Sequence, residues 1–336
     1  MKFDSQDLKR KFDMLKHTLE QEEKTKWDMW VNLSDLFMSK DGLIRRGFGN
    51  GARGLELSDY AMTQAFNRIG IPVKYGKKLM AERPDLVADQ FNHWVRKDDR
   101  RVLIRMRINE DGTGLIRGFL SDKYSILDNI QVFESLEKVL QQSPTANLAS
   151  FYMDDKRAHM RITFPDLTTD FGISTEGKHD VLQVGVDIVN SEVGASSLRV
   201  TPLVFRLVCL NGLRVWSADG DPFVQRHIHL TSNELFGRMN KAIVDAIKGG
   251  DEMLETLNNV RKIKVENPLS VIEELAKKQM YSQKLIDQAK TNFMIEPENS
   301  LYGVVNAFTR TARDLPNERR LEVEAYAGEI LKLQAV

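Results

Sequence analysis

The sequence predicts an α+β protein, in which a twisted, mainly antiparallel sheet is flanked by N-terminal helices and a C-terminal helical bundle. Two stretches, residues 101–120 and 179–216, alternate apolar with polar side chains or run almost continuously apolar, as β-strands do. The chain before and after these stretches has helical spacing and helix-capping residues instead. We therefore expect a helical region over residues 1–98, a central sheet domain with one crossover helix over residues 99–230, and a helical region over residues 231–336.

The composition is typical of a globular protein without an overall charge. The 336 residues include 48 Lys and Arg against 48 Asp and Glu, so the formal net charge is zero. Any anionic partner must therefore be held by a local patch of cations. The single cysteine, Cys209, allows no internal disulfide, and no segment has the ~20 consecutive apolar residues of a membrane helix. We expect a cytoplasmic protein of a host cell that does not enter the membrane.

The first predicted element is a helix over about Ser5 to Lys24. Its apolar residues Leu8, Phe12, Leu15 and Leu19 recur at spacings of four, three and four, which places them on one narrow seam. Such a seam packs against another helix, either in the same domain, which we favour, or in a second subunit.

A glycine-rich segment follows, with four glycines in eight positions from Gly47 to Gly54. Arg45 and Arg46 precede it and Arg53 lies within it. The glycines predict a mobile surface loop. Glycine-rich loops can hold phosphate, but this one lacks the GxxxxGK[ST] spacing, so we favour a plain loop over a nucleotide site.

Three helices are predicted next, over residues 59–69, about 75–80 and 84–96. Ser58 is suited to cap the first of them, and Gly70 is suited to end it. These helices complete the predicted N-terminal helical region.

The strongest local pattern is a β-hairpin over residues 101–120. The even positions of its first strand are apolar, and the odd positions carry arginine at 101, 105 and 107. The returning strand places Arg117 and Phe119 on one face. Neighbouring strands lie about 4.8 Å apart, so arginines on one face repel unless an anion or carboxylates lie between them.

Two kinds of partner would neutralise this arginine face, and we favour them equally. One is the phosphate of a nucleic acid, with an aromatic side chain stacking on a base. The other is a set of Asp or Glu side chains in a segment that covers the face. The nucleic-acid interpretation predicts these binding residues: Arg45, Arg46, Arg53, Arg101, Arg105, Arg107, Arg117, Phe119, Lys123 and Tyr124.

The longest strands are predicted between His179 and Trp216, where two apolar arms flank the polar segment Asn190-Ser191-Glu192-Val193-Gly194. Pro202 cannot donate to a ladder, so we expect a bulge or a sheet edge there. The preceding chain predicts a helix over about 128–141, strands near 148–153 and 158–164, and a loop over 165–178. The chain from Ser232 onward is predicted as helical, with a clear helix start at Asn267-Pro268.

No motif identifies an enzyme. His227 and His229 could lie on one face and hold a metal, but no acidic or cysteine partner accompanies them at supporting spacing. The pairs Asp154-Asp155 and Asp219/Asp221 lie in turn-like sequence, where Asp bonds to the local backbone. No GxSxG, HExxH, Walker or dinucleotide pattern is present. We expect no metal and no cofactor and favour a protein without catalytic residues, although an unfamiliar catalytic site has no regular pattern to find.

Five segments together resemble a known family. In chain order they are LSDYAMTQAFNRIGIP, FNHWV, IRGFLSDKYSILDN, NSEVGASSLRVTPLVFRLVCLNG and LYGVVNAFTRTA. They are similar to the phage- and plasmid-borne family catalogued as domain of unknown function 932, over about residues 57–331. The resemblance implies an origin in a mobile element, with genes that commonly lie among replication and recombination functions. It brings no established catalytic residues.

Two functions from different classes are predicted. The leading one is single-stranded DNA binding by the basic sheet face, extending to strand annealing, in phage or plasmid recombination or replication. The order of strands and helix after Arg101 is similar to the core of single-strand annealing proteins, at the level of analogy. The alternative is a protein-interaction factor, such as an inhibitor of a host defence system, in which the arginines are structural. A third, an unrecognised nuclease or nucleotide-processing enzyme, would need acidic side chains converging on a metal. Because annealing proteins act as multimers, we also expect a homo-oligomer.

Overall fold

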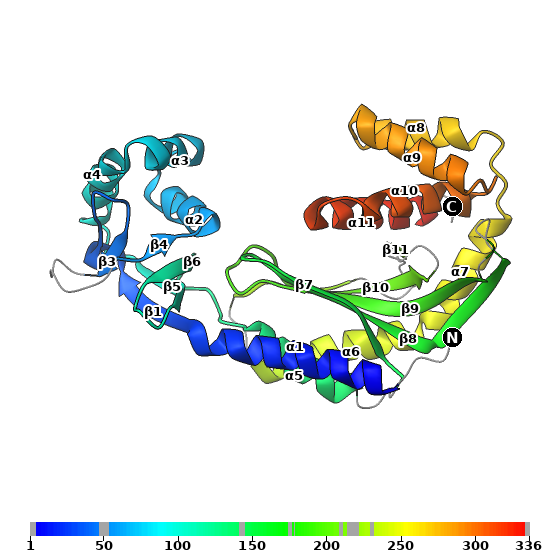
Figure 1. Ribbon diagram of the computed structural model, residues 1–336, viewed down its shortest axis with the longest axis horizontal. Helices are drawn as coiled ribbons and strands as arrows, with labels where there is room; N and C mark the ends of the chain where they lie inside the picture. Colours follow the sequence, from blue (N-terminus) through cyan, green and yellow to red (C-terminus); the bar gives the residue numbers. More distant parts are fainter. Residues whose placement is uncertain are drawn as a thin grey trace.

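Two lobes, each with its own β-sheet, make up the fold (Figure 1). The computed structural model describes residues 5–46, 54–140, 145–173, 177, 179–207, 211–213, 222–228 and 232–332. We define the N-terminal lobe as residues 26–121, and the C-terminal lobe as residues 122–332 together with the first helix. Strands and helices are both abundant, and helices follow a curled antiparallel sheet, so the α+β class is confirmed.

The N-terminal lobe is a four-stranded sheet with helices packed on one face. Its strand order is β1–β5–β6–β4, and the pair β4–β6 is parallel while the other pairs are antiparallel. Its strands are β1 Lys26–Asn32, β4 Glu56–Leu57, β5 Arg101–Ile108 and β6 Gly114–Ser121. Its helices are α2 Asp59–Ile69, α3 Val73–Glu82 and α4 Pro84–Val95. A 3-10 turn, Leu33–Asp35, leads into a separate strand pair, β2 Leu36–Met38 and β3 Ile44–Arg46.

This arrangement corrects the expectation of one sheet running from the arginine hairpin to the central strands. The hairpin β5–β6 pairs with β1, so it belongs to the sheet that the N-terminal helices cover. Its buried residues share one hydrophobic core with α2 and α4. The proposed division of the chain at residues 98 and 230 stays a prediction, although both sheets and cores group the hairpin with the N-terminal helices.

The capping signals of α2 explain its ends. The Ser58 hydroxyl accepts a hydrogen bond from the Ala61 amide at 3.1 Å, which satisfies one of the free amides of the first turn. Gly70 ends the helix with φ of +78°, a left-handed conformation that glycine adopts without strain. Both signals are confirmed, and the helix has the predicted bounds.

A β-bulge interrupts the alternation of the hairpin. Val102, Ile104 and Met106 are buried in the N-terminal core, which confirms the apolar face of β5. The register then shifts, because Arg105 pairs with Gly118 whereas Met106 pairs with Ile116, and Arg117 is the extra residue. The bulge therefore places Arg117 and Phe119 on opposite faces of the sheet. Phe119 is only 1% exposed, within the core.

The C-terminal lobe is built on a larger antiparallel sheet. The strand order is β11–β10–β9–β8–β7, and β12 also pairs with β10. The strands are β7 Asn147–Met153, β8 Ala158–Ile173, β9 His179–Asn190, β10 Leu198–Arg206, β11 Asn211–Leu213 and β12 Phe223–Gln225. The two long arms predicted on either side of the segment Asn190–Gly194 are thus β9 and β10. The predicted stretch ends at Trp216, and its residues beyond Leu213 lie outside the described residues.

Two sequence predictions for this sheet, the loop over residues 165–178 and the irregularity at Pro202, can be compared with the structure. The loop predicted over residues 165–178 is wrong in its first part, because β8 continues to Ile173 after a register shift between Thr163 and Thr168. Pro165 lies within that shift, where β8 is not paired with β9, so the sheet needs no amide hydrogen from the proline. Pro202 pairs with Val186 on one side. On its other side, β12 pairs with residues 198–200 and β11 with residues 204–206, so no described strand needs an amide from Pro202.

Helices lie on both faces of the larger sheet (Figure 1). On one face are α1 Ser5–Thr25, α5 Asn129–Leu140 and α6 Ser232–Lys248, with α7 Gly250–Lys262 at one end. On the other face lie α10 Leu301–Arg313 and α11 Asn317–Lys332, with α8 Pro268–Lys278 and α9 Gln283–Ile295 stacked on them. Their apolar sides form one core with the sheet.

Helix α1 packs within its own chain. Leu15 and Leu19 are buried in the C-terminal core, and the rings of Phe12 and Phe133 of α5 lie 6.2 Å apart. The favoured interpretation of the N-terminal seam is docking within its own domain; the helix does pack within the chain, but on α5, outside the predicted region 1–98. The described part of the seam, Phe12, Leu15 and Leu19, packs on the protein's own core, so the homo-oligomer stays a prediction that these residues do not support.

Candidate functional site

The turn between β9 and β10 joins the two lobes. Its residues Glu192, Val193 and Gly194 lie against β5, β6 and α2 of the N-terminal lobe. A side chain at Gly118 would place its Cβ 3.2 Å from the Cβ of Val193, so the glycine permits the close approach. Gln64 of α2 donates to the Val193 carbonyl at 2.9 Å. The polar segment that separates the two long strands in the sequence is therefore the contact between the lobes.

An ion-pair network lies beneath this turn. Glu192 Oε1 is 2.5 Å from Lys26 Nζ, and Glu192 Oε2 is 2.9 Å from Arg117 Nη2. The backbone amide of Asn129 also donates to Glu192 at 2.9 Å. Burial alone would raise the pKa of Glu192, but Lys26 and Arg117 outweigh it and lower this pKa to about 2. Glu192 is therefore a buried carboxylate that stays charged.

Arg105 completes the network. Its guanidinium pairs with Asp28 of β1 at 2.8 Å and with Asp128 at 2.6 Å, and it donates to the Glu192 carbonyl at 3.0 Å. Three cations, Lys26, Arg105 and Arg117, thus face three carboxylates, Asp28, Asp128 and Glu192. All three cations come from the N-terminal lobe, while Asp128 and Glu192 come from the C-terminal lobe. The charges therefore balance across the contact between the two lobes, which we call the joint.

The arginine face therefore lies against carboxylates of its own chain, as the second of the two interpretations expects. Arg105 and Arg117 are 2% and 4% exposed, so they offer no nitrogen to an external phosphate unless an ion pair breaks. Arg107 pairs with Glu22 of α1 at 2.7 Å. Phe119 is buried in the core and presents no ring face to a base. All four residues thus make contacts within the chain, and their role in binding nucleic acid stays a prediction that these contacts do not support.

The remaining predicted site residues are spread over the surface. Arg101 is exposed on β5, and its guanidinium lies 5.2 Å from the centre of the Trp30 ring. Arg46 is exposed on β3, with Arg45 half-buried beside it, and Arg53 lies outside the described residues. Lys123 is exposed between the lobes. Of the predicted set, Tyr124 and the buried Phe119 line the cleft described next.

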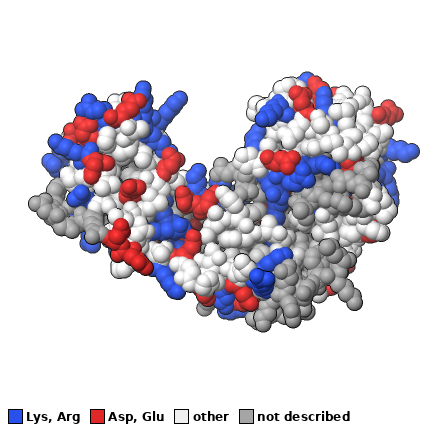
Figure 2. Space-filling model, in the orientation of Figure 1, with Lys and Arg blue, Asp and Glu red and all other residues white. Residues whose placement is uncertain are grey.

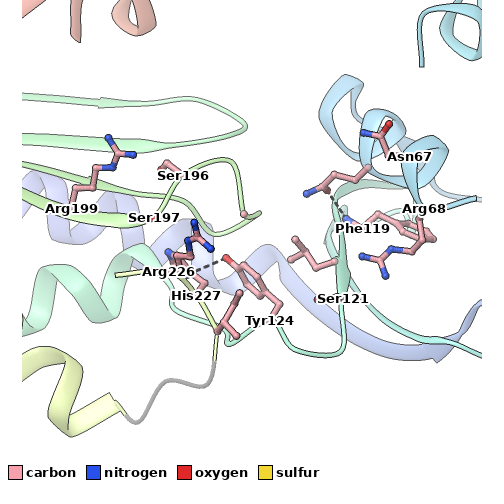
Figure 3. A pocket seen from close by; sticks show the side chains of 14 residues that line it. Asn67, Arg68, Phe119, Ser121, Tyr124, Ser196, Ser197, Arg199, Arg226 and His227 are labelled. Carbon is pink, nitrogen blue, oxygen red and sulfur yellow. Dashed lines mark hydrogen bonds between the residues drawn. The ribbon is translucent and has the colours of Figure 1, made fainter. Parts of the chain in front are cut away.

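A cleft of about 670 Å³ opens between the lobes beside the joint. Figure 2 shows the molecule hollowed there, with Lys and Arg as well as Asp and Glu around the hollow. Figure 3 shows Asn67 and Arg68 of α2 on one side of the cleft, and Arg199 and Arg226 of the C-terminal lobe on the other. Described residues that line it are Gln64, Asn67, Arg68, Phe119, Leu120, Ser121, Tyr124, Gly194, Ser196, Ser197, Arg199, Arg226, His227 and Ile228.

Among the described residues that line the cleft, the charged side chains are all arginines. Arg68, Arg199 and Arg226 line it, whereas none of its described lining residues is Asp or Glu. Arg199 and Arg226 are exposed, and neither forms an ion pair with the described part of the chain. Arg68 is half-buried, and its Nε has no hydrogen-bond partner there. Burial, and then the neighbouring Arg100, lower the pKa of Arg68. A bound anion would relieve both effects, so the cleft is suited to an anionic ligand.

Tyr124 and His227 form one wall of the cleft. Their rings stack with centroids 5.3 Å apart and planes 7° apart. The Tyr124 hydroxyl donates to the Ser191 carbonyl at 2.9 Å, so it accepts from His227 Nδ1, which is 3.2 Å away. The neutral imidazole then carries its proton on Nδ1, and its buried Nε2 has no partner among the described residues. A second proton would enter that desolvated position, and burial lowers the pKa of His227 to about 4.

This geometry predicts a pH dependence of stability. A histidine with a depressed pKa contributes stability that is full above the unfolded value of about 6.5 and is lost as the pH falls toward the folded value of about 4. Linkage gives a loss of about 2 kcal/mol between pH 7 and pH 5 from this one group. In His227→Phe, which keeps a ring against Tyr124 but cannot take up a proton, the free energy of unfolding should fall less over this interval. Denaturant unfolding of both proteins at the two pH values measures the difference, and equal losses would contradict it.

Other sequence features do not assemble a chemical site. Among the described residues, no group of three or more His, Cys, Asp or Glu side chains is placed to hold a metal ion. His229, Asp219 and Asp221 lie outside that part of the chain, as does Cys209. No helix in the described ranges is long and apolar enough to cross a membrane.

The three arginines of the cleft were not predicted. Arg199 alternates with buried Leu198 and Val200 on β10, a local sign that it faces outward. Arg68 lies on the exposed side of α2, opposite buried Phe66 and Ile69. Nothing in the sequence indicates that Arg68 and Arg199, which are 131 positions apart, face the same cleft. Only the joint at Glu192 brings them together.

The fold and the cleft together define an α+β protein of two lobes with a cationic site between them. Comparison with protein families identifies the chain further: it belongs to the family described as Domain of unknown function (DUF932), which matches residues 117–319, more than half of the chain. The match includes the Arg117–Tyr124 block and the turn at the joint. No curated protein matches the chain, and no solved structure matches it.

Proposed function

We propose that the protein binds single-stranded DNA in the cleft between its lobes. One observation carries the proposal: in a chain with no net charge, three arginines line the cleft and no carboxylate does so among the described lining residues. Backbone phosphates are the anions that such a site fits best when the ligand is a polymer. This interface differs from the hairpin face that the sequence indicates.

The other lining groups favour an unpaired strand over a duplex. Asn67, Ser196 and Ser197 add an amide and hydroxyls to the cationic walls, and such groups can form hydrogen bonds with base edges. In a duplex those edges are occupied by pairing, whereas in a single strand they are free to enter the cleft. Binding to single strands is also the function that replication or recombination in a phage or plasmid would use. Strand annealing would require, in addition, several copies acting together.

The alternative function has its own support. Arg105 and Arg117 pair inside the chain, as expected for a protein-interaction factor whose arginines are structural. For such a protein the cleft would take an acidic segment of a partner protein. The two functions are distinguished by the ligand that the cleft accepts.

The proposal predicts a specific loss in the variant Arg199→Ala/Arg226→Ala. Both side chains are exposed and unpaired within the described residues, so the fold should be unchanged. Affinity for a fluorescent oligothymidine should fall at least about tenfold, because two charge-assisted contacts are lost. The slope of log affinity against log salt should shrink by about 1.4, at about 0.7 for each phosphate contact. Fluorescence anisotropy at several salt concentrations measures both quantities.

The matched control is Arg96→Ala/Lys284→Ala, which removes the same charge from exposed positions outside the cleft. It should bind as the unchanged protein does. An equal loss in the control would show binding by general surface charge and contradict the cleft. If the unchanged protein binds neither single-stranded DNA nor RNA at low salt but binds a poly-glutamate peptide, the protein-interaction function is favoured instead.

A further inference from the structure

A second hollow adjoins the cleft on the side of the C-terminal helices. It measures about 370 Å³ and lies between the ends of β9 and β10, the residue before β8, and α11. Its lining residues are Arg157, Val189, Ala195, Ser196, Arg199, Thr201, Leu321, Glu322 and Ala325. Two of them, Ser196 and Arg199, also line the cleft. The two hollows therefore meet at Arg199 and form one groove that begins at α2 and ends at α11.

The groove continues the cationic character of the cleft. Arg157 lies on the wall of the second hollow, and its Nη2 donates to the Ala195 carbonyl at 3.2 Å, which holds the guanidinium beside the groove. The single carboxylate among the described lining residues is Glu322, and it pairs with Arg319 at 2.6 Å. Four guanidiniums, of Arg68, Arg226, Arg199 and Arg157, thus line a groove of two hollows.

Resting on the proposed function, we propose that this groove is a track for a short run of about five nucleotides, whose four backbone phosphates lie one at each of the four arginines. A mononucleotide would occupy the cleft alone and leave the second hollow unused. A longer strand reaches both hollows, with Arg199 between them. The ligand that the site selects is then an oligonucleotide, and four phosphate contacts give a salt slope of about 2.8.

A length series tests the track. Affinity of the unchanged protein for oligothymidines of two to ten nucleotides should rise steeply up to about five, the shortest with four backbone phosphates, and then level off. Arg157→Ala should lower the affinity for the octamer about tenfold and its salt slope by about 0.7, while the dimer, held in the cleft, should bind within about twofold of the unchanged protein. Arg226→Ala, in contrast, should weaken binding of both lengths.

A gain of charge provides the complementary variant. Glu322 is exposed on α11, so Glu322→Lys should fold normally and add a fifth cation to the second hollow. It should strengthen octamer binding and steepen its salt slope by about 0.7 without changing dimer binding. Octamer binding that responds to Arg226→Ala but to neither Arg157→Ala nor Glu322→Lys would overturn the track and leave single-strand binding in the cleft intact. Absence of any oligonucleotide binding would overturn both.

Discussion

Replacing Glu192 by glutamine should lower the free energy of unfolding by about 3 kcal/mol or more. The amide has the size of the carboxylate but no charge, and it leaves Lys26 and Arg117 buried without their main counter-ion. Breaking one side of a buried ion pair typically costs about 3–5 kcal/mol, because the remaining charge stays desolvated. Lys26 keeps Glu23 at 2.9 Å, which places the expected loss at the lower end of that range.

Denaturant unfolding of Glu192→Gln, compared with that of the control Glu110→Gln, tests the predicted loss in the free energy of unfolding. Glu110 is exposed in the turn of the hairpin, so its substitution removes the same charge from a solvated position and should change the stability little. The charge of Glu192 contributes to stability only above its pKa of about 2. The difference in the free energy of unfolding between the two variants should therefore shrink as the pH falls from about 4.5 toward 2. A Glu192→Gln protein as stable as Glu110→Gln would show that the joint does not depend on this charge.

Replacing Val204 by aspartate should abolish soluble folding. Val204 is 1% exposed in the C-terminal core, on β10 between Val184 of β9 and Leu213 of β11. An aspartate there would be desolvated, and the nearby Arg206 already pairs with Asp180 and Glu296. The uncompensated charge would cost about 4–5 kcal/mol or more, a large part of the about 5–15 kcal/mol that stabilises a typical fold. Val208, the neighbouring position on the same apolar arm in the sequence, lies outside the described residues.

The matched control is Val224→Asp on β12, where the valine is 46% exposed. The same side chain should be tolerated there and yield soluble protein. Expression and gel filtration of both variants give the result, and a soluble Val204→Asp protein with a cooperative melt would show that β10 is not in the core.

Local patterns predicted the elements well because each depends on neighbouring residues. The spacing of Leu15 and Leu19, the cap at Ser58 and the turn at Gly70 all act within one or two helical turns, and the structure has them. The alternation of Val102, Ile104 and Met106 likewise identified the buried face of β5. The bulge at Arg117 could not be predicted in this way, since it depends on the register between two strands, and it reversed the position of Phe119.

The site was harder to predict because it depends on how the lobes pack together. The arginine face was found, and its partners are the carboxylates of Asp28, Asp128 and Glu192, which lie up to 87 positions from Arg105 along the chain. Pairing over such distances is not encoded in local periodicity. The same holds for Arg68 and Arg199, which meet across the cleft only because Glu192 and Val193 fix the lobes.

Photocrosslinking tests the position of the bound strand most directly. An oligothymidine carrying 5-iodouracil would be bound to the unchanged protein, irradiated, and its crosslinked peptides identified by mass spectrometry. The cleft predicts crosslinks at Tyr124 and in the segments 194–199 and 222–228, and their loss in Arg199→Ala/Arg226→Ala. Crosslinks instead around Arg45, Arg46 and Arg101, which lie on the N-terminal lobe outside the cleft, would contradict binding in the cleft.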